Sequence, residues 1–99
     1  MNDLIGFFGP ETADAVIGVS GRAFAAWAVK ILSGGVAGRV TLRNGTSASA
    51  TAVTVLEGVA SQEVTREVAG GKGLVFPLGL FADLDANVTN YVVLGRIVG

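Results

Sequence analysis

Residues 73–99 of this 99-residue chain read GLVFPLGLFADLDANVTNYVVLGRIVG and hold most of its large apolar side chains. The apolar positions are rich in β-branched and aromatic residues, and glycines and a proline divide them into short pieces, which favours strands over helices. Tyr91–Leu94 is apolar at successive positions, so both faces of that strand need cover. A strand in the middle of a sandwich, or at a subunit contact, meets that need.

Strands with one buried face are predicted upstream of this stretch, because apolar and polar residues alternate there. In the segment 38–43, Val40 and Leu42 face inward and the residues between them face outward. The other strands expected upstream are Asp14–Ser20, Thr51–Gly58 and Glu63–Val68. Within residues 73–99 the expected strands are Leu74–Phe81 and Val88–Val98. Turns such as Asn44-Gly45 and Asp83–Asn87 separate strands at intervals of about 8–12 residues. The sequence therefore predicts an all-β chain folded as a small antiparallel β-sandwich, either jelly-roll or immunoglobulin-like.

The segment Arg22–Leu32 fits two structures. As a helix, its large apolar residues form an i, i+3, i+4, i+7 stripe, and its alanines favour this alternative. As a strand, Trp27, Val29 and Ile31 share one face. Because every later segment is predicted to be β, we expect a strand here, with Trp27 as the large aromatic residue of the core.

Residues 1–10 are expected to precede a single sandwich domain over residues 11–99. This segment is too apolar for a free solvated tail, because it contains Leu4, Ile5, Phe7 and Phe8. Two interpretations fit it: an N-terminal arm whose four apolar side chains dock on a neighbouring molecule, or a short edge strand of the same fold. Pro10 is expected to end any regular element. The segment lacks the basic region and unbroken apolar run of a signal peptide, so synthesis in the cytoplasm is expected.

The composition points to a partner. Hydrophobic residues make up 51% of the chain and charged residues 15%, against about 25% charged residues in an average soluble domain. A small domain with so few charges is expected to turn some apolar surface toward another chain. The net charge is -1 and the charges of both signs are scattered, so nucleic-acid binding through phosphates is not expected. No stretch is long and apolar enough to predict a membrane span.

The residues offer little for catalysis. The chain contains no cysteine and no histidine, which removes the commonest nucleophile, general base and metal ligands. Asp83, Asp85 and Asn87 have the alternate spacing of a calcium loop, but Val88 and Leu94 occupy the positions where such a loop needs Gly and Glu. The glycine-rich run 70–73 lacks the phosphate-loop pattern. We therefore expect no enzyme, no cofactor and no metal site.

Three segments carry a resemblance to a known family: Ala37–Ser47 (AGRVTLRNGTS), Gly73–Pro77 (GLVFP) and Leu80–Val88 (LFADLDANV). Together they resemble small structural proteins of tailed bacteriophages, in which a VTLRDGTS-like strand and turn precedes an LLFP-G-YVDLDANV-like block and a final apolar strand. The likeness extends from residue 24 onward and covers about two-thirds of the chain.

The resemblance implies a β-sandwich that is incorporated in a virion, most specifically as a capsid decoration (cement) protein. Such a protein binds the major capsid protein, stabilises the shell and forms symmetric homo-oligomers, with a trimer favoured. No catalytic residue is implied. Two alternatives are a tail, fibre or neck component of the particle, and a module that binds carbohydrate or a cell surface through loops such as Gly45–Ala50.

Overall fold

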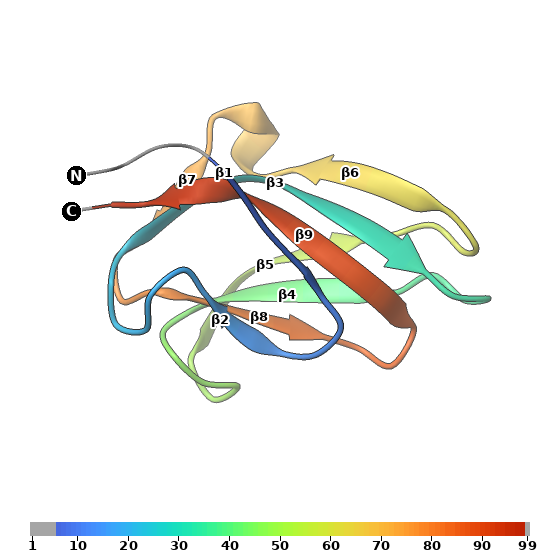
Figure 1. The fold of residues 1–99 in the computed structure, drawn as a ribbon, viewed down its shortest axis with the longest axis horizontal. Coiled ribbons are helices and arrows are strands. Elements are labelled where there is room, and N and C mark those ends of the chain that lie inside the picture. Colours follow the sequence, from blue (N-terminus) through green and yellow to red (C-terminus); the bar gives the residue numbers. More distant parts are fainter. Residues whose placement is uncertain (1–5, 99) are drawn as a thin grey trace.

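A computed structural model describes residues 6–98, which form two antiparallel sheets packed face to face (Figure 1). The elements are β1 (Gly6–Glu11), β2 (Ala15–Ile17), β3 (Phe24–Ser33), β4 (Arg39–Asn44), β5 (Thr51–Glu57), β6 (Glu63–Glu67), the 3-10 turn η1 (Ala69–Gly71), β7 (Leu74–Phe76), β8 (Leu80–Leu84) and β9 (Val88–Ile97). The predicted all-β sandwich is confirmed.

The strand order is that of a jelly roll. One sheet, here called the β9 sheet, has the order β1-β9-β3-β6, with β7 also paired to β3; the other, the β4 sheet, has the order β2-β8-β4-β5. This arrangement differs from the immunoglobulin order, so the jelly-roll alternative holds.

The core lies between the sheets and is filled from both. Val40 and Leu42 of β4 face inward and are fully buried, as their alternation predicts. Opposite them, β9 contributes Tyr91 and Val93. The other large and fully buried side chains are Phe24, Phe76, Ile17, Ile31, Leu80, Val29 and Val68. Gly95 leaves the space that the Phe24 ring occupies, because a Cβ there would lie 2.5 Å from that ring.

The segment 22–32 is a strand, as expected, but Trp27 is not in the core. The pairing of β3 with β9 shifts between Ala26 and Ala28, so a β-bulge at Trp27 reverses the alternation of the faces. Phe24 and Ala26 point inward before the bulge, and Val29 points inward after it. Trp27 is half-buried instead, with the Arg96 guanidinium 5.8 Å from its ring centroid.

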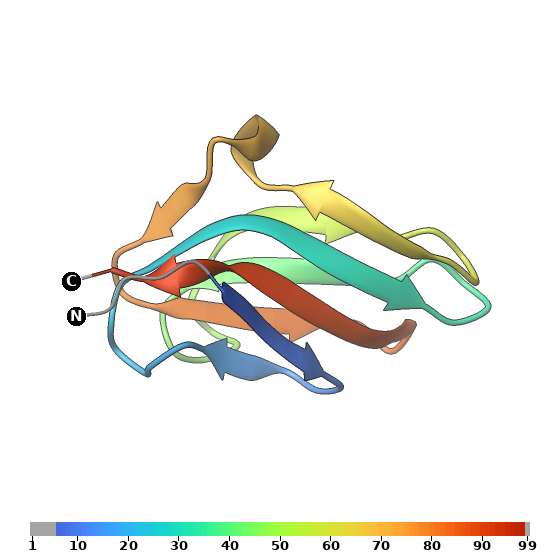
Figure 2. The same ribbon diagram turned by 45° about the horizontal axis from the view of Figure 1, so that its top comes forward.

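The predicted strand Leu74–Phe81 is two strands in different sheets. Leu74–Phe76 pairs with β3 as β7, and Leu80–Leu84 pairs with β4 as β8. Pro77 lies in the turn that crosses between the sheets, where its missing N–H costs no ladder bond. The expected turn at Asp83–Asn87 is correspondingly shorter, because Asp83 and Leu84 belong to β8. Figure 2 shows β6 and β7 following one another along β3, with η1 raised between them.

Residues 6–10 belong to β1, an edge strand of the same fold. β1 pairs antiparallel with β9, and the register shifts between Phe8 and Glu11. Pro10 therefore sits at an irregularity inside the strand and does not end it, because a bulge at a sheet edge tolerates a residue without an N–H. Residues 1–5, including the rest of the predicted arm, lie outside the described residues.

The connection from β1 to β2 is tied to both sheets. The Tyr91 hydroxyl donates a hydrogen bond to the Ala13 carbonyl oxygen (3.0 Å), and the Leu84 N–H donates to Asp14 Oδ1 (2.9 Å). Burial of the phenol, with the carboxylates of Glu11 and Asp14 nearby, raises the pKa of Tyr91 above its ordinary value of 10.0. The neutral phenol is therefore the form that holds this crossing in place.

Candidate interaction surface

The outward side of β9 is apolar as well as its inward side. Tyr91 and Val93 point into the core, whereas Val92 and Leu94 point out of the sandwich. The run of four apolar residues predicted that both faces of this strand need cover; Tyr91 and Val93 are fully buried in the core, whereas Val92 and Leu94 stay partly exposed on the outer face. The outer side of β9 is therefore a candidate surface for binding a partner.

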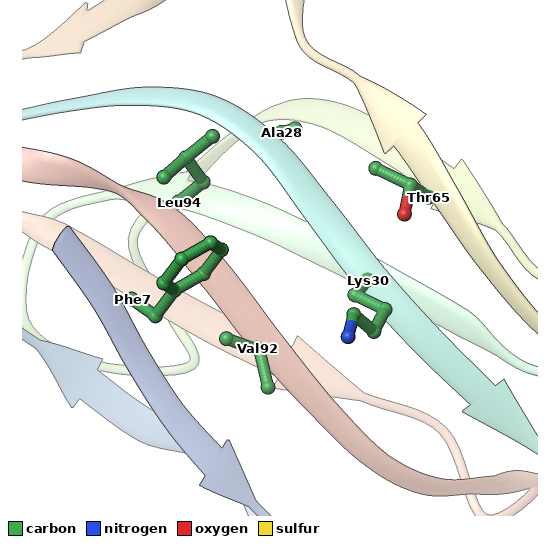
Figure 3. A pocket seen from close by; sticks show the side chains of 6 residues that line it. All are labelled: Phe7, Ala28, Lys30, Thr65, Val92 and Leu94. Atoms are coloured by element: carbon green, nitrogen blue, oxygen red, sulfur yellow. The ribbon is translucent and has the colours of Figure 1, made fainter. Parts of the chain in front are cut away.

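Neighbouring strands extend this apolar surface. Leu94 pairs with Phe7 of β1 on one side and with Ala28 of β3 on the other. We call Phe7, Ala28, Val92 and Leu94 the apolar face; with Lys30 and Thr65 they line a small open pocket (Figure 3). Its volume is about 50 Å³, far below the roughly 300–1,000 Å³ of small-molecule sites. A pocket of this size accommodates the tip of a side chain from another protein.

Two of the four predicted docking residues lie among the described residues, and their side chains point to opposite sides of β1. Phe7 is 74% exposed and belongs to the apolar face. Phe8 points to the other side of β1 and packs edge-on against Phe24, with ring centroids 5.0 Å apart. Its side chain is partly buried and packs against the core cluster. Leu4 and Ile5 lie outside the described residues.

Charged side chains border the apolar face on one side. Lys30 Nζ lies 4.0 Å from Glu63 Oε1, and both side chains are about half exposed. Thr65, which pairs with Lys30, completes this border. An apolar centre with a polar, solvated rim is the usual layout of a protein–protein contact.

The outer side of the β4 sheet is built differently. Arg43 Nε donates to Asp83 Oδ2 (3.0 Å), and its Nη1 donates to the Ala50 carbonyl oxygen (3.0 Å). Arg39 Nε donates to Glu57 Oε2 (3.1 Å). We call this the charged face; half-buried Phe81 lies on it near β2, and exposed Val53 and Val55 lie on it at β5. Its charges are already paired within the chain, so it offers a weaker case for a partner.

The acidic turn is explained by internal contacts. Asp83 pairs with Arg43, and Asp85 Oδ1 accepts a hydrogen bond from the Asn87 N–H (2.9 Å). Within residues 6–98 no three His, Cys, Asp or Glu side chains are grouped so that they could hold a metal ion. The glycine-rich run 70–73 begins within the short turn η1 and leads into β7, with Gly73 packed against the Trp27 ring.

The loop Gly45–Ala50 is compact and polar. The Ala50 N–H donates to the Ser47 carbonyl oxygen (3.0 Å), and the Ser47 and Ser49 hydroxyls are hydrogen-bonded to each other (2.9 Å). The Gly45 N–H donates to Gly79, which joins this loop to the turn after β7. The loop contains no aromatic side chain that could stack on a sugar ring.

Sequence reasoning missed Ala28 and Lys30 as parts of a surface, and named Val92 and Leu94 only as residues that need cover. The signal for the latter pair was present in the continuous apolar run. Strand alternation does place Ala28 and Lys30 opposite Val29 and Ile31, and the bulge changes the facing only of Trp27 and the residues before it.

Comparisons of the chain with protein-family models, with curated proteins and with solved structures found no match. No helix in the part of the chain that the structure describes is long and apolar enough to cross a membrane.

Proposed function

We propose that this chain is a structural protein of a bacteriophage particle, and specifically a capsid decoration protein that binds the major capsid protein and stabilises the shell. The observation that supports it best is the apolar face, where an aromatic ring 74% exposed sits beside Val92 and Leu94 on the outside of a filled sandwich. The resemblance of the segments quoted above to phage structural proteins supplies the kind of partner.

The physical mechanism is surface burial repeated over many copies. Burying one Phe side chain contributes roughly 1.5–3 kcal/mol, and hot spots of binding are enriched in aromatic anchors inside a polar rim. Phe7 bordered by Lys30 and Thr65 has this layout. A single contact of this size is weak, but an oligomer that engages several capsid subunits at once binds much more tightly.

The jelly-roll fold does not choose between the candidate functions, because viral capsid proteins and lectins both use it. Carbohydrate binding through Gly45–Ala50 has less support, since its serine hydroxyls bond to each other. A tail, fibre or neck position uses the same apolar face and differs only in where the protein sits on the particle. We propose no catalytic activity and no cofactor, and place the protein in the assembled virion.

The test uses phage particles made in a strain whose copy of this gene carries an early stop codon. Purified protein is added back, the particles are sedimented, and bound protein is located by gold-labelled antibody in electron micrographs. The proposal predicts that added protein binds heads at many sites and raises the temperature at which they open. Label on tails alone supports the tail alternative, and no binding to any particle contradicts both.

A further inference from the structure

The four exposed sheet edges are not equally protected against pairing with another chain. Unpaired backbone groups on an edge invite an added strand, and proteins block them with proline, charges, irregularities or short strands. β1 carries Pro10 and a register shift, and β2 has three residues. Three of the five residues of β6 are charged. β5 is seven residues long, has no proline, and carries its one charge at the last residue, Glu57.

The hydrogen bonds around β4 show which β5 groups point outward. Arg39 accepts a hydrogen bond at its carbonyl from Asp85, so its backbone groups are directed toward β8. In an antiparallel strand successive residues point to opposite sides, so Val40 and Leu42 are directed toward β5. Their partners there are Leu56 and Thr54. It follows that the backbone N–H and C=O of Val55 point away from the sheet.

Part of this edge is already used. The Glu57 carbonyl accepts a hydrogen bond from Arg66 Nε (2.8 Å), and the register of β5 against β4 shifts at Val53. The free, regular part is therefore short and centred on Val55. Both Val55 (53% exposed) and Val53 (45% exposed) present apolar side chains there.

This short edge is complementary to itself. An antiparallel copy aligned on Val55 places Val55 opposite Val55, Thr54 opposite Leu56, and Val53 opposite Glu57. The two Glu57 side chains then lie at opposite ends of the contact, each still paired with its own Arg39 (3.1 Å). No like charges face one another, and the unpaired groups of Val55 gain partners.

We propose that two copies of this chain pair through β5, antiparallel about a two-fold axis at Val55, so that their β4 sheets become one continuous sheet. A two-fold contact of this kind is closed, because the same patch is used by both copies. It leaves the apolar face free. The inference does not depend on the phage function, and it gives a dimer in place of the trimer that the resemblance implies.

The first test is the mass in solution, by light scattering after size exclusion. The proposal predicts twice the chain mass of 10.0 kDa. Val55→Lys puts like charges opposite one another and is expected to weaken the dimer at least tenfold. Val75→Lys is the matched control, because Val75 is 54% exposed on β7 and lies outside the contact. A monomer or a trimer for the unaltered chain overturns the proposal.

The second test needs no weakened variant. The chain has no cysteine, so Val55→Cys introduces a single thiol at the axis. Residues that face each other as a hydrogen-bonded antiparallel pair have Cα atoms about 5.5 Å apart, which suits a disulfide. Mild oxidation is expected to convert most of Val55→Cys to a covalent dimer on a non-reducing gel, and far less of Val75→Cys. Equal cross-linking of the two variants contradicts the proposed contact.

Discussion

The β9 sheet and the β4 sheet cover the same core but expose different side chains to solvent. The outer side of the β4 sheet carries the ion pairs Arg39–Glu57 and Arg43–Asp83, and its edge strand β5 adds the exposed side chains of Val53 and Val55. The outer side of the β9 sheet carries Phe7, Val92 and Leu94 beside the single ion pair of Lys30 and Glu63. A fold alone does not require this difference, because one polar outer face is ordinary for an antiparallel sheet. Apart from the β5 edge, for which a contact between two copies is proposed above, the apolar face is the sheet surface that calls for a functional explanation.

The largest effect is expected on binding to phage heads, which a substitution in the apolar face should weaken. Phe7→Asp removes the aromatic anchor and adds a charge to the apolar face, so affinity for phage heads should fall more than tenfold, a loss of about 1.4 kcal/mol or more. Val36→Asp is the control, because Val36 is 60% exposed in the loop before β4. Co-sedimentation with heads measures both. Equal binding by the two variants would contradict a role for the apolar face in binding.

The next comparison is between neighbouring residues of β9. Val93→Thr places a hydroxyl in the buried core, where it has no water to bond, and should lower the free energy of unfolding by about 1–3 kcal/mol. Val92→Thr makes the same chemical change on the outer side and should stay within about 0.5 kcal/mol of the unaltered chain. Urea unfolding measures the two. A large loss for Val92→Thr would mean that the apolar face serves the fold and not a partner.

The connection between β1 and β2, which Tyr91 holds by a hydrogen bond, is expected to make the free energy of unfolding depend on pH. Tyr91→Phe removes the donor to Ala13 and should lower the free energy of unfolding by about 1 kcal/mol at neutral pH. Because the pKa of Tyr91 is raised in the folded chain, its contribution is fully present below about pH 10, the ordinary tyrosine value, and is lost as the pH rises above it.

The phenylalanine variant should therefore lose less stability than the unaltered chain between neutral pH and strongly alkaline pH. Tyr91 is the only tyrosine of the chain, so its ionisation can be followed directly by ultraviolet absorbance. Ionisation near pH 10 without unfolding would show that the phenol is not buried as described.

The smallest effect concerns the charged face. Arg43 and Asp83 are about one-quarter exposed, whereas Arg39 and Glu57 are more than half exposed. A double-mutant cycle with Arg43→Met and Asp83→Asn should give a coupling energy of about 1 kcal/mol, and one on Arg39 and Glu57 less than about 0.5 kcal/mol. Raising the salt concentration should reduce the second coupling more than the first. The reverse ranking would show that exposure does not set these energies.

Local patterns were enough to predict most strands. The alternation around Val40 and Leu42 placed both in the core, and the apolar run Tyr91–Leu94 indicated a strand that needs cover on two sides. These predictions succeeded because side chains alternate strictly along a regular strand. The jelly-roll order could not be predicted, because it depends on contacts between strands far apart in the chain.

The errors came from irregularities that leave no mark on the hydrophobic pattern. Around Trp27 the residues on both faces of the strand are apolar, so the sequence pattern gave no sign of the bulge that turns Trp27 outward. Phe7 and Phe8 are chemically identical, and only the register of β1 against β9 decides that Phe8 packs on Phe24 while Phe7 is exposed. Of this pair, Phe7 is exposed and Phe8 is partly buried against the core.

The central claim is that the apolar face is the side that meets the particle, and cysteine protection measures it most directly. Thr65→Cys places a thiol at the border of the apolar face, and Thr41→Cys places one on the charged face. Each variant is treated with a maleimide, alone and bound to phage heads, and the two labelling rates are compared. We expect binding to slow labelling at position 65 strongly and at position 41 little. Protection at position 41 with none at position 65 would contradict the account.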